Sequence, residues 1–204
     1  RFHKSQNYKQ IGKLNHHYLV SPYVNKTKIL NNSQVNRNYD FKNLSKLKFK
    51  FKKILSSNEL KKLKIDKLFK CQIPLKSKDY LINRYLNHPI YKYHIYYIGN
   101  KKIMNLCIFR IVELKNINII RIIDYVGSNK SFIFLKEFFY EILKIYKAEY
   151  LDFYSYGIPL KILRKTGLQN KNENNKIIIP NFFEPFLNKN INISTGYRKL
   201  GASG

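Results

Sequence analysis

The chain has 204 residues, of which 44% are hydrophobic and 15% aromatic. This apolar content suffices for one large folded domain or two small ones and excludes a disordered chain. The formal net charge of +27 is a value typical of nucleic-acid-binding proteins. However, the favoured residues are Lys, Asn, Ile, Tyr and Phe, which an AT-rich genome encodes most easily. We therefore interpret much of the lysine as solvated surface, and we do not expect nucleic acid as a partner.

Cysteine usage and hydropathy exclude several further classes of protein. Cys71 and Cys107 cannot form a disulfide framework and lack partners at the spacing of a zinc site. Cys107 lies inside an apolar run, so we expect it to be buried and expect no metal. No apolar run approaches the roughly 18 residues of a membrane span, and no signal peptide is visible. From the absence of both signals we expect a cytoplasmic protein. The chain starts at Arg1 without Met, so we also expect a lost N-terminus.

The first part of the chain is weakly patterned. Residues 1–45 are polar and Asn-rich around one apolar stretch, HHYLVSPYV. In 46–54 (KLKFKFKKI), apolar residues alternate with lysine, which predicts a strand with one face in water. Ser56 and Glu59 have the spacing of a capping box and predict the start of a short helix. The pattern is lost near Pro74, where we expect a boundary.

The second part of the chain is better organised. Ser77 is placed to cap a helix that must end before Pro89, because the residue before proline avoids the α region. The expected elements that follow are strands over 91–98, 103–112 and 119–126, a helix with one apolar face over 135–146, a strand over 149–156, a helix over 159–167 and a strand over 176–180. This order predicts an α+β fold with one mixed sheet flanked by helices.

The first candidate site is the loop Gly127–Ser131, which joins a predicted strand to the long helix. Free N–H groups at a helix start attract anions. Lys130 adds positive charge, and Gly127 would let a ligand approach the backbone. The alternative is a plain strand-to-helix turn with Ser131 as N-cap. The residues that we expect to bind the anion are Tyr125, Val126, Gly127, Ser128, Asn129, Lys130 and Ser131.

The second candidate site is the strand AEYLDFYSYG. Its side chains alternate between two faces, so Asp152, Tyr154 and Tyr156 should share one face. A buried acid requires partners. Asp152 is therefore either paired with a basic residue or exposed in a cleft, where it could act as a general base.

The third candidate site is the segment KIIIPNFFEPF. Its two prolines fix the backbone, Phe182 and Phe183 supply apolar walls, and Asn181 and Glu184 supply polar groups, as in a substrate-binding loop. The alternative is a hydrophobic plug over the end of the sheet. Tyr91, in the aromatic stretch NHPIYKYHIYY, could stack on a ligand or belong to cross-strand pairs.

Four blocks of the sequence, in order, resemble an acyltransferase-like family of the GNAT superfamily that occurs in bacterial surface-polysaccharide clusters. The resemblance covers about residues 77–193, with a weaker match at 11–19. The four blocks are RYLNHPIYKYHIYYI, RIIDYVG, AEYLDFYSYG and IIIPNFFEPF. The resemblance implies an acyl-CoA-binding fold in which the strands 119–126 and 149–155 splay apart and the loop 127–131 meets the CoA pyrophosphate.

The resemblance also implies a function. We expect an N- or O-acyltransferase that uses acetyl-CoA or another acyl-CoA and acts on a sugar or nucleotide sugar of surface glycan synthesis. The expected general base is Asp152 or Glu184, Tyr154 and Tyr156 are expected to position the substrate, and the segment with Asn181 is expected to bind the acceptor. The alternatives are a GNAT-like binding protein without catalysis and a basic nucleic-acid-binding protein.

The lost-catalysis alternative depends on one departure from the family. Leu163 stands near the place of the tyrosine that often acts as general acid. The expected organisation is a less regular α+β region over 1–70, a GNAT-like domain over 71–193 and an irregular tail over 194–204. One interpretation of 1–70 is the remainder of a truncated first half of the same type.

Overall fold

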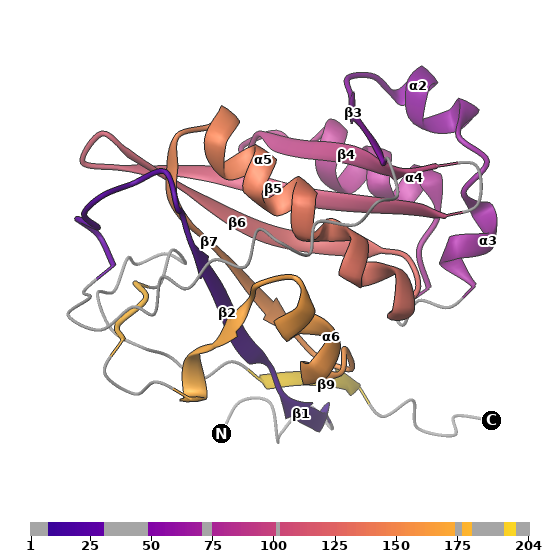
Figure 1. Ribbon diagram of the computed structural model, residues 1–204. Helices are drawn as coiled ribbons and strands as arrows, with labels where there is room; N and C mark the ends of the chain where they lie inside the picture. Colours follow the sequence, from indigo (N-terminus) through magenta and orange to yellow (C-terminus); the bar gives the residue numbers. More distant parts are fainter. Residues whose placement is uncertain are drawn as a thin grey trace.

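The computed structural model describes residues 8–30, 49–70, 75–100, 103–173, 177–180 and 194–198. Its main feature is a seven-stranded sheet with the strand order β3-β4-β5-β6-β7-β2-β8 (Figure 1). All neighbours in this sheet are antiparallel except β6 and β7, which run parallel. The predicted α+β class with one mixed sheet is confirmed, and the arrangement is compatible with a GNAT-like fold.

The strands come from all three of the regions that the sequence suggested. Their bounds are β1 Tyr8–Lys13, β2 Asn15–Val20, β3 Lys50–Ile54, β4 Tyr93–Gly99, β5 Met104–Leu114, β6 Ile117–Val126, β7 Ala148–Ser155, β8 Gln169–Asn170 and β9 Ser194–Arg198. Strands β2 and β3 belong to the first 70 residues, yet they pair with β7, β8 and β4 in the main sheet. The expected boundary near residue 70 therefore runs between strands of one sheet.

One expectation for the end of the chain needs correction. We expected residues 194–204 to be irregular, but Ser194–Arg198 form β9 and pair antiparallel with β1. The pairing partner lies almost the whole chain away, so no local pattern indicates this strand. Residues 199–204 lie outside the described part.

Two of the helices, α2 and α4, begin at residues whose side chains cap them. Their bounds are α2 Ser57–Lys62, α3 Asp66–Phe69, α4 Lys78–Leu81 with its π-helical continuation η2 Ile82–Leu86, the 3-10 helix η3 Lys130–Phe134, α5 Leu135–Ile145, α6 Leu160–Lys165 and the 3-10 turn η4 Lys171–Glu173. Ser56 accepts a hydrogen bond from the N–H of Glu59, and Ser77 accepts one from the N–H of Tyr80. Both predicted caps are confirmed.

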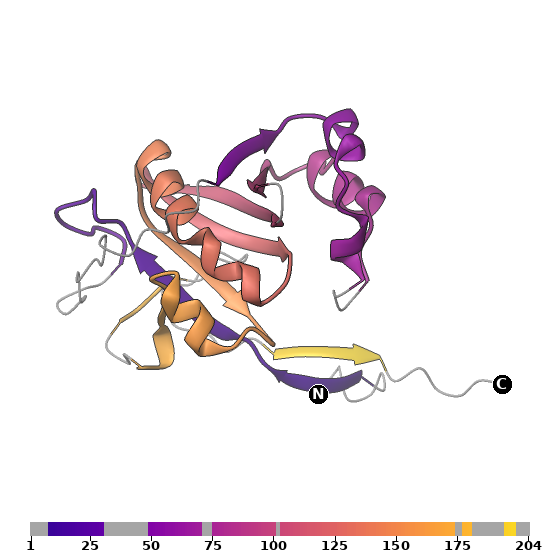
Figure 2. The same ribbon diagram turned by 45° about the vertical axis from the view of Figure 1, so that its right-hand side comes forward.

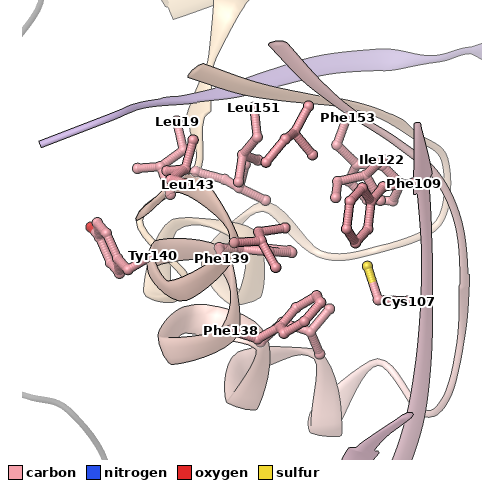
Figure 3. Packing of buried hydrophobic residues seen from close by; sticks show 14 of the residues in the cluster. Leu19, Cys107, Phe109, Ile122, Phe138, Phe139, Tyr140, Leu143, Leu151 and Phe153 are labelled. Atoms are coloured by element: carbon pink, nitrogen blue, oxygen red, sulfur yellow. The ribbon is translucent and has the colours of Figure 1, made fainter. Parts of the chain in front are cut away.

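Helix α5 covers one face of the sheet with the largest apolar cluster. Figure 3 shows Phe138 and Phe139 of this helix turned toward the strands, where Phe109 lies. Cys107 is fully buried in the same cluster, as predicted, and burial raises the pKa of its thiol. This face is thus filled by aromatic and aliphatic side chains.

Helices α2–α4 and η2 cover part of the opposite face (Figure 2). Their residues Leu60, Leu81 and Tyr85 belong to one buried cluster with Ile95 and Ile108 of the sheet. Beside them, a separate cluster of buried residues lies over β2, β6 and β7. Its members are Tyr18, Val20, Leu30, Ile119, Tyr150, Ile177 and Ile179. Polar side chains of the sheet share this face with the two apolar clusters.

Candidate functional site

The two parallel strands of the sheet separate before they end. Their pairing stops at Ile122 and Phe153, although β6 continues to Val126 and β7 to Ser155. At this point β6 carries an extra residue, Ile123, because the neighbouring residues of β5 pair with Asp124 and Ile122. Such a bulge bends a strand and increases its twist. The strands accordingly run apart in Figure 1, with β6 leading into η3 and β7 toward α6.

A row of polar side chains crosses the sheet on the face opposite α5. Consecutive cross-strand partners make up this polar row, which reaches six of the seven strands. Directly paired residues project to the same face of a sheet. The members are, from β4 to β8, Tyr93, Arg110, Arg121, Asp152, Tyr18 and Gln169.

The centre of the polar row is a buried ion pair. Arg121 Nε lies 3.1 Å from Asp152 Oδ1, and its Nη2 lies 2.7 Å from Oδ2. Asp152 has no exposed surface, and Arg121 is 4% exposed. Burial alone raises the pKa of Asp152, but the charge of Arg121 and hydrogen bonds from His16 and Arg121 outweigh it and lower the pKa to about 2.

These contacts favour one of the two interpretations of Asp152. A carboxylate with a pKa of about 2, and with both oxygens engaged, is poorly suited to take a proton at neutral pH. The geometry therefore favours the paired acid over the general base. Arg121 was missed by the sequence reasoning, although a lone arginine in the apolar run IIRIIDYV is itself a signal of a buried partner.

His16 of β2 is the second partner of Asp152. Its Nε2 lies 3.0 Å from Asp152 Oδ2, and its ring stacks on Tyr154 at 3.9 Å between centroids and 13° between planes. Because the ionised carboxylate can only accept, Nε2 carries a proton. Nδ1 has no hydrogen-bond partner in the part of the chain that the structure describes. The carboxylate thus orients the imidazole and leaves its second nitrogen for another group.

His16 also lies at the point where the parallel strands separate. It pairs with Tyr154, the first residue of β7 beyond the last pair with β6. The sequence reasoning missed this histidine because HHYLV was treated only as an apolar stretch. The alternation that places His16 and Tyr18 on one face was visible in the sequence, but the pairing of β2 with β7 was not.

The two tyrosines predicted beside Asp152 have different environments. Tyr154 is half-buried on the face of Asp152, as predicted, and burial followed by the charge of Asp152 raises its pKa to about 12. Tyr156 lies beyond the end of β7 and is 53% exposed, with its ring against Gly12. The site therefore brings together Asp152 and Tyr154 and leaves Tyr156 at its margin.

A buried polar network lies beneath the loop that follows β6. The Tyr125 hydroxyl is 2.7 Å from Asn105 Oδ1 and 3.0 Å from Ser131 Oγ. Ser131 Oγ is 2.6 Å from the same Asn105 oxygen, and its N–H donates to Ser128. Ser131 therefore ties the loop to the buried side chains of Asn105 and Tyr125 and is not the N-cap that we considered.

The same network corrects the role expected of Gly127. A Cβ on this residue would lie 2.3 Å from Asn105 Oδ1 and 2.4 Å from the Tyr125 hydroxyl. Side chains of the protein fill the space beside its Cα, so glycine is needed for packing and not for the approach of a ligand on that side. Val126 is likewise buried, in the cluster under α2–η2.

The outer part of the loop fits an anion better. Ser128, Asn129 and Lys130 are exposed, and their backbone N–H groups donate to no acceptor among the described residues. Ser128 and Asn129 precede η3, which begins at Lys130 and continues into α5, so the positive end of this helical segment lies at the loop. Asn129 Nδ2 donates to the carbonyl of Gly157 at 3.0 Å and so links the loop after β6 to the turn after β7.

A second ion pair anchors the end of β6. Asp124, next to the bulge, has Oδ1 2.5 Å from Lys76 Nζ and accepts a hydrogen bond from the Tyr85 hydroxyl at 2.9 Å. Burial and the charge of Asp124 raise the pKa of Tyr85. These contacts tie η2, and the segment before α4, to the part of β6 that has left β7.

Of the predicted substrate-binding residues, only Tyr91 lies in the described part of the chain. Tyr91 is half-buried, with the guanidinium carbon of Arg110 3.7 Å from its ring centroid, so it contacts the polar row. The predicted substrate-binding residues Asn181, Phe182 and Phe183 and the candidate base Glu184 lie outside the described residues.

The described ranges contain no group of three or more His, Cys, Asp and Glu placed to hold a metal ion. Within the same ranges, no helix has the length and apolarity needed to cross a membrane. Comparison with protein-family models, curated proteins and solved structures finds no match to this chain.

Proposed function

We propose that this chain is an acyl-CoA-dependent acyltransferase of GNAT type that acts on an amino or hydroxyl group of a sugar or nucleotide sugar. The observation that carries the proposal is the separation of β6 and β7 at the bulge, with His16 and Asp152 at its rim. The resemblance of four sequence blocks to that family supports the same activity.

The donor is expected to bind between the separated strands. Beyond Ile122, the edge of β6 that faces β7 is free of the ladder, and the amide groups of a pantetheine arm can pair with such an edge as an added strand does. The exposed N–H groups of Ser128–Lys130 and the positive end of α5 would then hold the pyrophosphate. Backbone N–H groups of β6 near the bulge would polarise the thioester carbonyl.

His16 is the proposed general base. In the neutral imidazole, Nδ1 would take the proton from the acceptor nitrogen or oxygen, whose lone pair then forms a bond to the thioester carbon. The carbon–sulfur bond breaks, and the CoA sulfur leaves with the electron pair and takes up a proton. Asp152 holds the imidazole with its proton on Nε2, and Arg121 fixes Asp152, so both are positioning residues. Glu184 stays a second predicted base.

The activity is tested by following CoA release from acetyl-CoA in the presence of a panel of amino sugars and of sugars that carry only hydroxyl groups. The variant His16→Gln should lower kcat by about a hundredfold or more while binding of acetyl-CoA persists. The variant Asp79→Asn, at an exposed position of α4, is the control and should leave kcat unchanged. Full turnover in His16→Gln would remove His16 from catalysis, and absence of acetyl-CoA binding by the wild type would contradict the whole proposal.

A further inference from the structure

Arg110 of β5 carries a positive charge that no described carboxylate neutralises. It is the direct cross-strand partner of Arg121, and like charges directly opposite each other destabilise a sheet. The one acid of the polar row, Asp152, is bound to Arg121 with both oxygens. Arg110 takes part in none of the ion pairs of the described residues and makes no hydrogen bond there through its side chain. The polar row thus has one uncompensated guanidinium.

The guanidinium is held in a fixed orientation. Its carbon lies 3.7 Å from the centroid of the Tyr91 ring, so its planar face is occupied by the aromatic ring. Stacking of this kind leaves the N–H donors at the edge of the guanidinium free to bind another group. A planar fork of donors matches a carboxylate or a phosphate, which it binds through two parallel hydrogen bonds.

The ring under Arg110 is also fixed in place. His88 Nδ1 accepts hydrogen bonds from the N–H groups of Ile90 at 3.2 Å and Tyr91 at 3.0 Å, which forms a tight turn before β4. The His88 ring stacks on Tyr91 at 5.2 Å, and Tyr93 meets Tyr91 edge-on at 6.4 Å. The half-buried aromatic surface beside Arg110 is therefore preorganised before any ligand binds.

We propose that Arg110 and Tyr91 form a binding site for an anionic sugar, whose carboxylate or phosphate is held by the guanidinium and whose ring contacts the tyrosines. Arg121 connects this site to His16 through Asp152. That the anionic sugar is the acceptor of the acyl group rests on the proposed function. The anion site itself is independent of acyl transfer.

The test measures binding by calorimetry in the absence of CoA, with glucuronic acid, glucose 1-phosphate and glucose as probes. The wild type should bind at least one of the two anionic probes and bind glucose more weakly, and the better probe identifies the preferred anion. Arg110→Gln should weaken that binding by about tenfold or more, because a charge-assisted hydrogen-bond pair is lost. Arg84→Gln removes the same charge from an exposed position on η2 and should have no effect.

Two further measurements allow for a folding defect in Arg110→Gln and separate the anion site from the proposed acyl transfer. If Arg110→Gln does not fold, as judged by its thermal unfolding, Arg110→Lys keeps the charge without the fork and should also weaken binding. Equal weakening by Arg84→Gln and Arg110→Gln, or no preference of the wild type for either anion over glucose, would overturn the site. Titration of the same samples with acetyl-CoA separates the two proposals, since anion binding without CoA binding would support this site and contradict the proposed activity.

Discussion

Replacing Asp152 by Asn would remove the negative charge that neutralises Arg121 in the middle of the sheet. Arg121 is 4% exposed and Asp152 has no exposed surface, so water cannot replace the lost partner. Removal of one member of such a buried pair costs about 3–5 kcal/mol. Because a domain is stable by only roughly 5–15 kcal/mol, Asp152→Asn should lose a large fraction of its free energy of unfolding.

The same carboxylate makes stability depend on pH. Its pKa is 3.8 in the unfolded chain and about 2 in the folded protein. A lowered pKa stabilises the fold above the unfolded value, by about 2 kcal/mol here. This contribution is lost as the pH falls from about 4 to about 2. The Asn side chain does not titrate, so the variant should lack this part of the acid destabilisation.

Urea denaturation at pH 7 and in steps below pH 4 measures both effects. Asp79→Asn, on the exposed side of α4, is the matched control and should unfold like the wild type. Removing both charges, with Arg121→Met and Asp152→Leu together, should recover much of the lost stability because no buried charge is left unpaired. A loss of less than about 1 kcal/mol in Asp152→Asn at pH 7 would show that Arg121 and Asp152 do not form a desolvated ion pair.

Three further outcomes follow from other buried groups. Glu149 is 2% exposed and accepts hydrogen bonds from three backbone N–H groups of the segment after β2. Glu149→Gln should therefore lower the free energy of unfolding by about 2–3 kcal/mol. An unchanged urea midpoint would speak against these hydrogen bonds. Gly127→Ala should lower the free energy of unfolding by more than about 1 kcal/mol, because the new methyl group would displace Asn105 and the Tyr125 hydroxyl. A thermal midpoint equal to that of the wild type would be inconsistent with this packing. Burial, and then the charge of His16, lower the pKa of His17 from 6.5 to about 4. The free energy of unfolding should therefore fall as the pH drops through this interval. An NMR titration that shows His17 protonated at pH 6 would contradict the lowered pKa.

The order of the elements could be predicted from the sequence because it depends on local signals. Capping residues such as Ser56 and Ser77 set helix starts, and turns separate the strands of the hairpin that ends in β5. The position of β2 could not be predicted, because its pairing with β7 joins residues more than a hundred positions apart. Without this pairing, His16 has no visible relation to Asp152.

Only the part of the candidate site that depends on local sequence patterns was predicted. Alternation along β7 placed Asp152 and Tyr154 on one face correctly, and it indicated that a buried acid needs a partner. The identity of that partner depends on the register between β6 and β7, which one sequence does not determine. The interior of the loop was misjudged, since Gly127 and Ser131 face side chains of the protein and not a ligand.

Calorimetric titration with acetyl-CoA at moderate salt is the direct test of whether this chain binds an acyl-CoA. We expect saturable binding that Lys130→Glu weakens by about tenfold, because the reversed charge lies at the expected pyrophosphate loop. Lys62→Glu, at an exposed position of α2, should bind like the wild type. Absence of acetyl-CoA binding, together with strong and salt-sensitive binding of a DNA duplex in the same buffer, would contradict the proposed acyltransferase and favour a nucleic-acid-binding protein.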